Sequence, residues 1–214
     1  MQIQITNNLK HQAALGVVAC KVQVTKSGSE LVSLLTNETE TITQKFTVEN
    51  FTEQKAISDS RATYTALGRN PNRYPVSSEA LIKRILQGKG LYYINNVVDI
   101  NNLVSIRSGY SVGSYNIGNT NGDIIFRQGA AGEKYKGIGK AEFELEHLPL
   151  LADDTGAFGS PTSDSERAMI TAATQYIILV IYGFGISDLT QWIEQAKELL
   201  QQHAKATAIE TFTI

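Results

Sequence analysis

The 214-residue sequence has few of the features that mark secreted and membrane proteins. Its one cysteine, Cys20, excludes an internal disulfide framework and most thiolate metal sites. Its longest candidate apolar run, Ile177 to Ile181, is much shorter than the ~18–20 residues that a membrane span needs. Polar and apolar residues alternate over positions 1–5, which is not the pattern of a signal or transit peptide. We therefore expect a cytoplasmic protein that has no membrane partner.

The sequence also lacks the phosphate-binding pattern G-x-x-x-x-G-K-[ST] and the zinc-protease pattern H-E-x-x-H. Its three histidines (His11, His147 and His203) lie in polar contexts and lack the spacing of paired metal ligands. Cys20 alternates with valines, which favours a core position over a nucleophile. We expect no metal and no cofactor.

Charge is distributed unevenly along the chain. The net charge of the protein is −2, but residues 61–107 contain seven basic side chains and only two acidic ones, Glu79 and Asp99. If they form one surface, the basic residues would attract a phosphate backbone, and otherwise they are one solvated helix face. These basic residues are Arg61, Arg69, Arg73, Lys83, Arg84, Lys89 and Arg107.

Helical and strand patterns both occur, without a flexible linker or an internal repeat. Helical spacing predicts a short helix near 31–35, one ending near 67, one after Ser77 and Ser78, one over 96–106, and a terminal helix capped by Ser187. Strand patterns occur at 18–24, 124–127, 143–145, 177–181 and around 211–214, and 157–163 reads as a loop. The sequence predicts one compact α+β domain over residues 1–214.

Polar side chains gather at three places where simple structural roles are also possible. Asp99 and Asn102 share one face of an apolar helix, Arg127 and Glu133 flank a glycine-rich turn, and 164–167 reads Asp-Ser-Glu-Arg. Ser163 and Glu166 have the spacing of a capping box, which would make the last group a helix start. Taken together, the three groups favour a polar cleft.

These residues fall within a longer resemblance. Two strings, Glu79-Ala-Leu-Ile-Lys-Arg-Ile and Ile94-Asn-Asn-Val-Val-Asp-Ile-Asn-Asn102, resemble the first half of the B3/B4 module of the bacterial phenylalanyl-tRNA synthetase beta subunit. Its second half is similar to Tyr115-Asn116, Ile124–Arg127, Gly132-Glu133, Asp153-Asp154 and the glycine-rich loop after Gly156. The resemblance covers 61–182, with 1–60 and 183–214 as elaborations. Two groups of positions, Arg61, Tyr64 and Leu67-Gly68, and Asp164-Ser165 with Arg167, resemble stand-alone proteins that carry this module more than the synthetase itself.

The resemblance implies a compact α+β fold of the B3/B4 type and an editing role. In the synthetase, the module hydrolyses tyrosine wrongly attached to the phenylalanine tRNA. By resemblance, the partner is the 3′ end of a tRNA or aminoacyl-tRNA, or a free amino acid, and no DNA is expected. The implied substrate-binding residues are Asn102, Tyr115, Arg127, Glu133, Asp164, Ser165 and Arg167. No catalytic residue is identified.

Two positions differ from the synthetase pattern. Gly113 stands where the editing pocket of the synthetase has a histidine, and apolar residues around Leu179 occupy the neighbourhood of a glutamate. The adenylate-forming motifs of a synthetase are absent. Three functions therefore remain: a hydrolase that edits mischarged tRNA in trans, a non-catalytic module that binds RNA or an amino acid, and a scaffold recruited to another small molecule.

Overall fold

The computed structural model describes residues 2–139, 142–185 and 188–214. A central antiparallel sheet has the order β10-β2-β9-β3, formed by Thr207–Thr213, Ala13–Lys21, Tyr176–Phe184 and Ser111–Asn116. A second sheet has the order β1-β4-β7-β8, formed by Ile3–Ile5, Ile124–Gln128, Pro149–Asp153 and Gly156–Gly159. Strands β1 and β4 are parallel, and the other pairs of this sheet are antiparallel. Lys134–Tyr135 (β5) and Phe143–Glu144 (β6) form a small separate ribbon.

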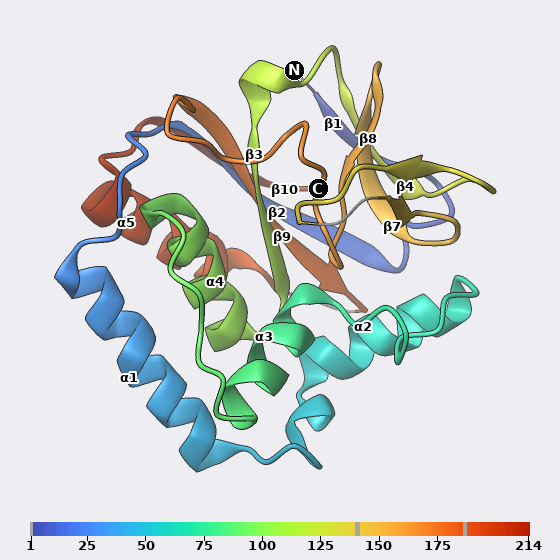
Figure 1. Ribbon diagram of the computed structural model, residues 1–214. Helices are drawn as coiled ribbons and strands as arrows, with labels where there is room; N and C mark the ends of the chain where they lie inside the picture. The colour runs from blue at the N-terminus through green and yellow to red at the C-terminus, as the bar shows by residue number, and fades with distance from the viewer. Residues whose placement is uncertain (1, 140–141, 186–187) are drawn as a thin grey trace.

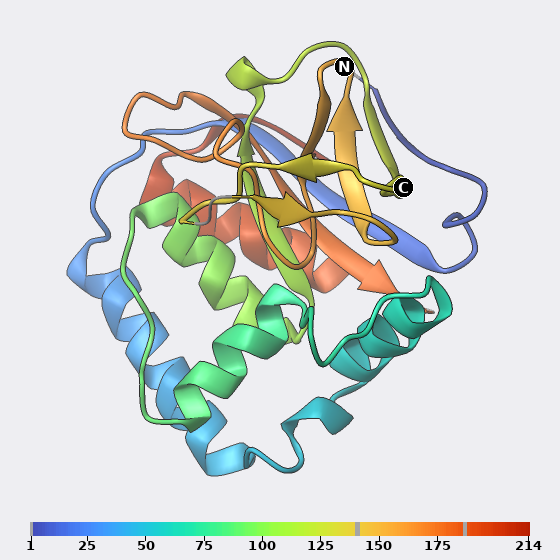
Figure 2. The same cartoon turned by 45° about the vertical axis from the view of Figure 1, so that its right-hand side comes forward.

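Five α-helices complete the described structure. They are α1 (Ser29–Lys45), α2 (Lys55–Ala66), α3 (Ser77–Leu86), α4 (Asn96–Ser108) and α5 (Thr190–Ala204), with short 3-10 turns at Phe51–Glu53 and Ile117–Asn119. Figure 1 shows α1, α4 and α5 on one side of the central sheet and the second sheet on the other. The turned view in Figure 2 keeps this order of three layers. In the described residues, no helix has the length and apolarity to cross a membrane.

Strand β9 explains why residues 177–181 are apolar without alternation. Ile177, Leu179 and Ile181 face the helices in one hydrophobic cluster, whereas Ile178 and Val180 face the second sheet in another. A strand covered on both faces needs apolar side chains at every position. Strand β9 therefore contributes side chains to two hydrophobic clusters, one on each face of the central sheet.

Local signals set the ends of α4, which positions part of the site. The Asn95 side chain accepts a hydrogen bond from the Val98 amide at 3.0 Å and caps the first turn. Gly109 closes the helix with a φ of 75°, a left-handed conformation that glycine adopts without strain. Buried Asp99 accepts hydrogen bonds from the Ser27 hydroxyl and the Ile94 amide, so it holds the segment that enters the helix.

Most of the predicted elements are present, and four predictions need correction. The first helix is much longer than predicted, the strand expected over 18–24 begins earlier and ends at Lys21, and the loop expected over 157–163 begins as strand β8. No helix follows Ser163; the Ser165 and Glu166 amides instead donate to the Phe158 and Lys136 carbonyls, so the capping-box interpretation is wrong. The predicted cap Ser187 lies outside the described residues.

Candidate functional site

Tyr115 fills the space between the two sheets. It is fully buried on β3, and its ring packs edge-on against Phe158 of β8 with centroids 5.2 Å apart. Glycines make room for the ring, because a Cβ added at Gly113 would lie 2.1 Å from the Tyr115 hydroxyl oxygen and one at Gly159 would lie 2.2 Å from its Cε1. Contacts this short are impossible, so both glycines are required by the position of Tyr115. Gly113 is thus part of the tightly packed interface around Tyr115.

The Tyr115 hydroxyl connects the interface to Asp164. It donates to Asp164 Oδ1 at 2.7 Å and lies 2.6 Å from the Tyr182 hydroxyl, which has its own proton to donate. The Ser160 amide donates to the same Asp164 oxygen at 3.3 Å. Burial raises the pKa of Asp164 to about 6, although the hydrogen bond from Tyr115 acts in the opposite direction. Asp164 is therefore a fixed carboxylate that changes charge close to neutral pH.

A cavity of about 220 Å³ lies beside Asp164. Its walls are mainly apolar, and three polar side chains reach it: Asn101 from α4, Ser114 from β3, and Asp164. Both hydrogen bonds to the Asp164 carboxylate go to Oδ1, so Oδ2 has no donor within the described part of the chain. We call this the Asp164 cavity; its other lining residues are Ile94, Val98, Ile138, Met169 and Ile170.

Asn101, one residue before the predicted Asn102, lines the cavity. The Ser114 hydroxyl donates to Asn101 Oδ1 at 3.1 Å, and Asn102 contacts Asn101 by a long 3.5 Å bond. The neighbour of Asp164, Ser165, is 2% exposed and its hydroxyl has no hydrogen-bond partner among the described residues. Of the predicted residues, Tyr115 and Asp164 are in contact and Ser165 follows Asp164 in the chain, whereas Asn102 does not line the cavity.

Arg127 and Glu133 pair with each other at a separate place. Two bonds of 2.8 Å and 2.6 Å join the guanidinium to both oxygens of Glu133, which also accepts from the Ala130 amide. The hydrogen bonds from Arg127 lower the pKa of Glu133 despite partial burial. This pair closes the turn after β4, and neither side chain lines the Asp164 cavity.

Arg167 is also held by the protein. It donates to both oxygens of Asp153 at 2.8 Å and 3.0 Å, and to the carbonyls of Asn119 and Gly156. The Asp153 side chain is fully buried. Arg167 therefore fastens the 164–167 segment to the β7–β8 hairpin, which positions Asp164.

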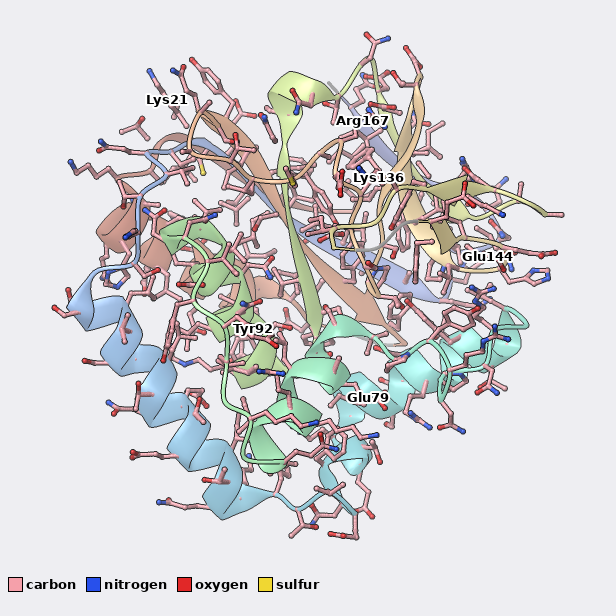
Figure 3. All side chains as sticks on the ribbon, in the orientation of Figure 1. Lys21, Glu79, Tyr92, Lys136, Glu144 and Arg167 are labelled. Atoms are coloured by element: carbon pink, nitrogen blue, oxygen red, sulfur yellow. The ribbon has the colours of Figure 1, made fainter. Side chains whose placement is uncertain are left out.

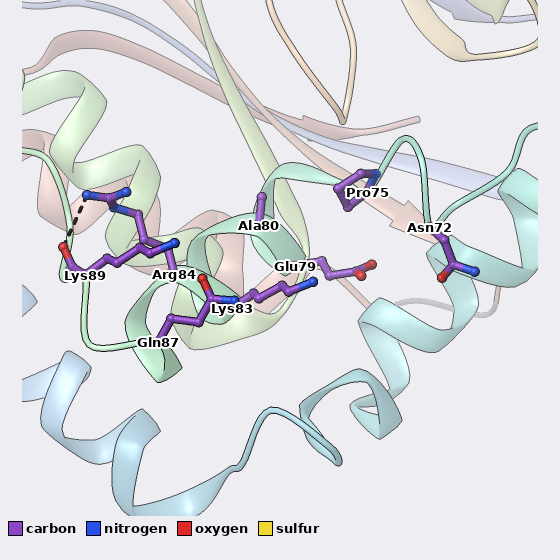
Figure 4. Close-up of a pocket in the computed structure, with 8 residues that line it drawn as sticks. All are labelled: Asn72, Pro75, Glu79, Ala80, Lys83, Arg84, Gln87 and Lys89. Atoms are coloured by element: carbon purple, nitrogen blue, oxygen red, sulfur yellow. Dashed lines mark hydrogen bonds between the residues drawn. The ribbon is translucent and has the colours of Figure 1, made fainter.

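Part of the basic segment lines two adjoining hollows, whereas Arg107 pairs with Glu38 of α1 elsewhere, so the seven basic residues do not all share one surface. One of about 390 Å³, which we call the basic hollow, is shown in Figure 4. The other, of about 630 Å³, lies along α2 and shares Asn72 with it. The residues that line the basic hollow are Asn72, Pro75, Glu79, Ala80, Lys83, Arg84, Gln87 and Lys89.

Aromatic side chains lie next to these basic residues. The Arg84 guanidinium stacks 3.9 Å from the centre of the Tyr92 ring, and that of Arg69 stacks 3.5 Å from the Tyr74 ring. Tyr92, Tyr93 and Ile94 are between 51% and 65% exposed on the segment that leads to α4. Figure 3 labels Tyr92 in front of α4 and Glu79 below it on α3. Basic and aromatic groups together are typical of single-stranded RNA surfaces.

Sequence reasoning missed several residues of these sites. Asn101 and Ser114 had no signal apart from the neighbouring motif, and Glu79 was noted only as an acidic residue of the basic segment and as part of the family resemblance. The string Gly109-Tyr-Ser-Val-Gly113 has the G-x-S-x-G spacing of hydrolases, which sequence reasoning also passed over. However, Ser111 begins a strand after a helix, is 1% exposed and contacts Ser78, so it is no nucleophile elbow. Among the described residues, no three His, Cys, Asp or Glu side chains gather as metal ligands would.

Comparisons with known proteins place the fold and the family. Phenylalanine–tRNA ligase beta subunits are similar to parts of the chain: that of Cutibacterium acnes is 29% identical over 124 residues, and that of Aquifex aeolicus is 38% identical over 77. These matches cover 57% and 36% of this chain, but only 15% and 10% of the two relatives.

A solved structure has the same fold. The N-terminal fragment of the phenylalanyl-tRNA synthetase beta subunit from Pyrococcus horikoshii matches with a TM-score of 0.50 and 12% identity, over 100% of this chain and 53% of the fragment. The B3/4 domain family matches residues 59–205. The chain therefore belongs to the B3/4 domain family, and the predicted mixed helix and sheet fold is confirmed.

Proposed function

We propose that this B3/4-domain protein binds the 3′ end of an aminoacyl-tRNA and hydrolyses the ester between the amino acid and the terminal ribose. The observation that carries the proposal is the Asp164 cavity, whose mainly apolar lining includes a carboxylate held through Oδ1, with no donor to Oδ2 among the described residues. Relatives named as phenylalanine–tRNA ligase beta subunits support a tRNA-related role.

The Asp164 cavity suits the amino-acid end of such a substrate. Apolar walls accept an apolar side chain, and Asp164 Oδ2 accepts a proton from water as the water oxygen attacks the ester carbonyl. The ribose oxygen then leaves and takes the proton back from Asp164. Asn101 Nδ2, whose one hydrogen bond to the described residues is 3.5 Å long, is the donor we assign to the developing oxyanion.

The basic surface suits the polynucleotide end. Lys89 borders the basic hollow and Ile94 borders the Asp164 cavity. Because Ile94 is five positions after Lys89, the Cα atoms of these two residues lie at most about 18 Å apart. A single strand crossing this distance would pass the exposed rings of Tyr92 and Tyr93, on which bases stack.

The test is deacylation of a panel of mischarged tRNAs, beginning with tyrosyl-tRNA(Phe) and including several other amino acids. We expect hydrolysis above the spontaneous rate with at least one substrate, and its loss in Asp164→Asn. Asp154→Asn is the matched control, because Asp154 is an exposed carboxylate outside the cavity. Hydrolysis at the wild-type rate in Asp164→Asn would contradict the role of Asp164 as the proton acceptor.

A binding module without catalysis is the second candidate. It is favoured by Gly113, which stands at the position of the synthetase histidine, and by the Tyr115 ring in the adjoining space. In the same assay, salt-sensitive retention of tRNA without hydrolysis would select this function. Neither retention nor hydrolysis would reject both.

A further inference from the structure

Glu79 in the basic hollow is an incompletely paired carboxylate. Its side chain is 9% exposed, and Arg61 donates to Oε1 at 2.8 Å. The second oxygen, Oε2, is buried and has no hydrogen-bond partner among the described residues. A buried acceptor left unpaired costs free energy, so its presence at the wall of a hollow calls for a ligand that donates to it.

The neighbouring hollows contain further unpaired groups. Six buried side-chain atoms lack a partner in the described structure, and three of them, Glu79 Oε2, Arg84 Nε and Arg69 Nε, belong to residues that line these two hollows. The sheet–sheet interface contributes only Ser165 Oγ to this group. Unpaired polar groups are thus concentrated where the surface is open and basic.

The charges around Glu79 restrict the chemistry of the ligand. Lys83, Arg84 and Lys89 share the hollow with Glu79, and Arg61 already neutralises its charge. A cationic donor such as an ammonium group would be repelled by this surplus of positive charge. The ligand that fits carries a neutral N–H donor close to a negative charge. A nucleotide has this combination, in the exocyclic amino group of its base and in its phosphate.

We propose that the basic hollow reads a nucleobase of single-stranded RNA, and that Glu79 Oε2 accepts a hydrogen bond from the exocyclic amino group of the base. The inference rests on the proposed function and adds base selection to it. Cytosine offers an amino group at its position 4 and uracil an acceptor oxygen, which the carboxylate repels. The hollow therefore selects cytosine over uracil.

The side chains around Glu79 permit this contact. Figure 4 shows Lys83 extended across the hollow toward Glu79. Lys83 is exposed and has a long flexible side chain, so an incoming base displaces it and places it on the neighbouring phosphate. Lys89 lies on the same rim and is also exposed. The base then occupies the hollow while the phosphates stay with the lysines.

The test compares the binding of cytidine and uridine hexaribonucleotides by fluorescence anisotropy at one fixed salt concentration. Wild-type protein is expected to bind the cytidine hexamer about tenfold more tightly, as one hydrogen bond to a charged group allows. In Glu79→Gln, the amide can donate to uracil, so the preference should vanish or reverse while the salt dependence of binding is kept. The matched control is Glu133→Gln, which breaks a different arginine–glutamate pair and should leave the preference unchanged.

Equal affinity of wild-type protein for the two hexamers would overturn base reading and leave the proposed tRNA function standing. A cytidine preference that persists in folded Glu79→Gln would overturn the role of Glu79. If this variant does not fold, the ratio of the affinities of wild-type protein for the two hexamers still decides whether cytosine is preferred over uracil. Competition by CMP over UMP without hexamer binding would overturn RNA as the source of the base, and no binding of any probe would reject this inference. The deacylation panel tests the proposed function separately.

Discussion

Two arginine–glutamate pairs, Arg127–Glu133 and Arg61–Glu79, are completed differently. In the Arg127–Glu133 pair beside β4, both carboxylate oxygens accept from the arginine, and the Ala130 amide adds a third bond. In the Arg61–Glu79 pair over α2 and α3, one oxygen is paired and the other is buried without a partner in the described part of the chain. The first pair is complete within the protein, whereas the second lacks a donor.

Whether a polar side chain finds all its hydrogen-bond partners within the protein is a better guide to a ligand-binding role than the type of residue is. Around the sheet–sheet interface, Arg127, Arg167 and Tyr115 each find their partners inside the chain. At the basic hollow, the protein leaves acceptors and donors unpaired beside an opening. A carboxylate that the protein already satisfies holds structure, and one that it leaves unsatisfied has capacity for a ligand.

The largest effect is expected where the interface is most tightly filled. Gly113→Ala should destabilise the protein by about 3 kcal/mol and lower Tm by about 6–12 °C, because the new methyl group overlaps the Tyr115 hydroxyl. Gly28→Ala is the matched control, since a Cβ there meets nothing within 4 Å. Thermal unfolding measures both. Similar losses in the two variants would mean that the interface is loosely packed.

Asp164→Asn should raise stability at pH 7 by about 1–3 kcal/mol, because burial disfavours the charged carboxylate. The folded pKa of about 6 is above the usual pKa of aspartate, so the penalty is absent below about pH 4 and complete above about pH 7. Urea unfolding at pH 4 and pH 7.5 measures the difference. A variant less stable than wild type at pH 7.5 would contradict burial of this charge.

The proposed hydrolysis requires the ionised form of the same group. The rate should therefore fall as pH decreases through about 6, in a profile of kcat/KM against pH. A flat profile between pH 5 and pH 8 would contradict the role of Asp164 as the proton acceptor.

The two pairs should respond differently to neutralisation. Glu133→Gln should cost about 1–2 kcal/mol at pH 7, and Glu79→Gln should stay within about 0.5 kcal/mol of wild type, since it removes a charge with an unpaired buried oxygen. Because Arg127 lowers the pKa of Glu133, the contribution of Glu133 is lost only as pH falls below the usual glutamate pKa. Denaturant unfolding at pH 7 and pH 3 measures the two stability changes. Equal losses of stability in the two variants at pH 7 would contradict the difference between the pairs.

The smallest stability effects are expected at the rim of the basic hollow. Lys83→Ala and Lys89→Ala should each change stability by less than about 0.5 kcal/mol, because both side chains are exposed. Each should reduce the slope of log affinity for tRNA against log salt by about 1. Lys10→Ala, at an exposed lysine in the loop before β2, is the control. An unchanged slope in both rim variants would mean that the lysines of the basic hollow do not contact the phosphates of the tRNA.

Sequence patterns predicted the elements whose signals are local. The α4 boundaries follow from the Asn95 cap and Gly109, and β9 was evident from its β-branched residues. The second face of β9 was not evident, because an unbroken apolar run does not say which layers cover it. A capping-box spacing at Ser163 and Glu166 was wrong because tertiary contacts with Phe158 and Lys136 take the amides instead.

The site was predictable only in part, since pairing depends on contacts distant in the chain. Tyr115 and Asp164 come together across 49 residues, which no spacing rule indicates. Arg127 and Glu133 were correctly seen as neighbours across a turn, but the sequence did not show that they complete each other. The sequence did not single out the Glu79 side chain as incompletely paired, because its burial and the position of Arg61 decide which of its oxygens has a partner among the described residues.

The most direct test of the account is the affinity of a tRNA that carries an amide-linked, non-hydrolysable amino acid, measured against the same tRNA without it. If the Asp164 cavity receives the amino acid while the basic surface holds the strand, the charged form should bind about tenfold more tightly, and Asp164→Asn should remove this difference without weakening the uncharged tRNA. Equal affinity of the two forms for wild-type protein, across several amino acids, would contradict the central claim.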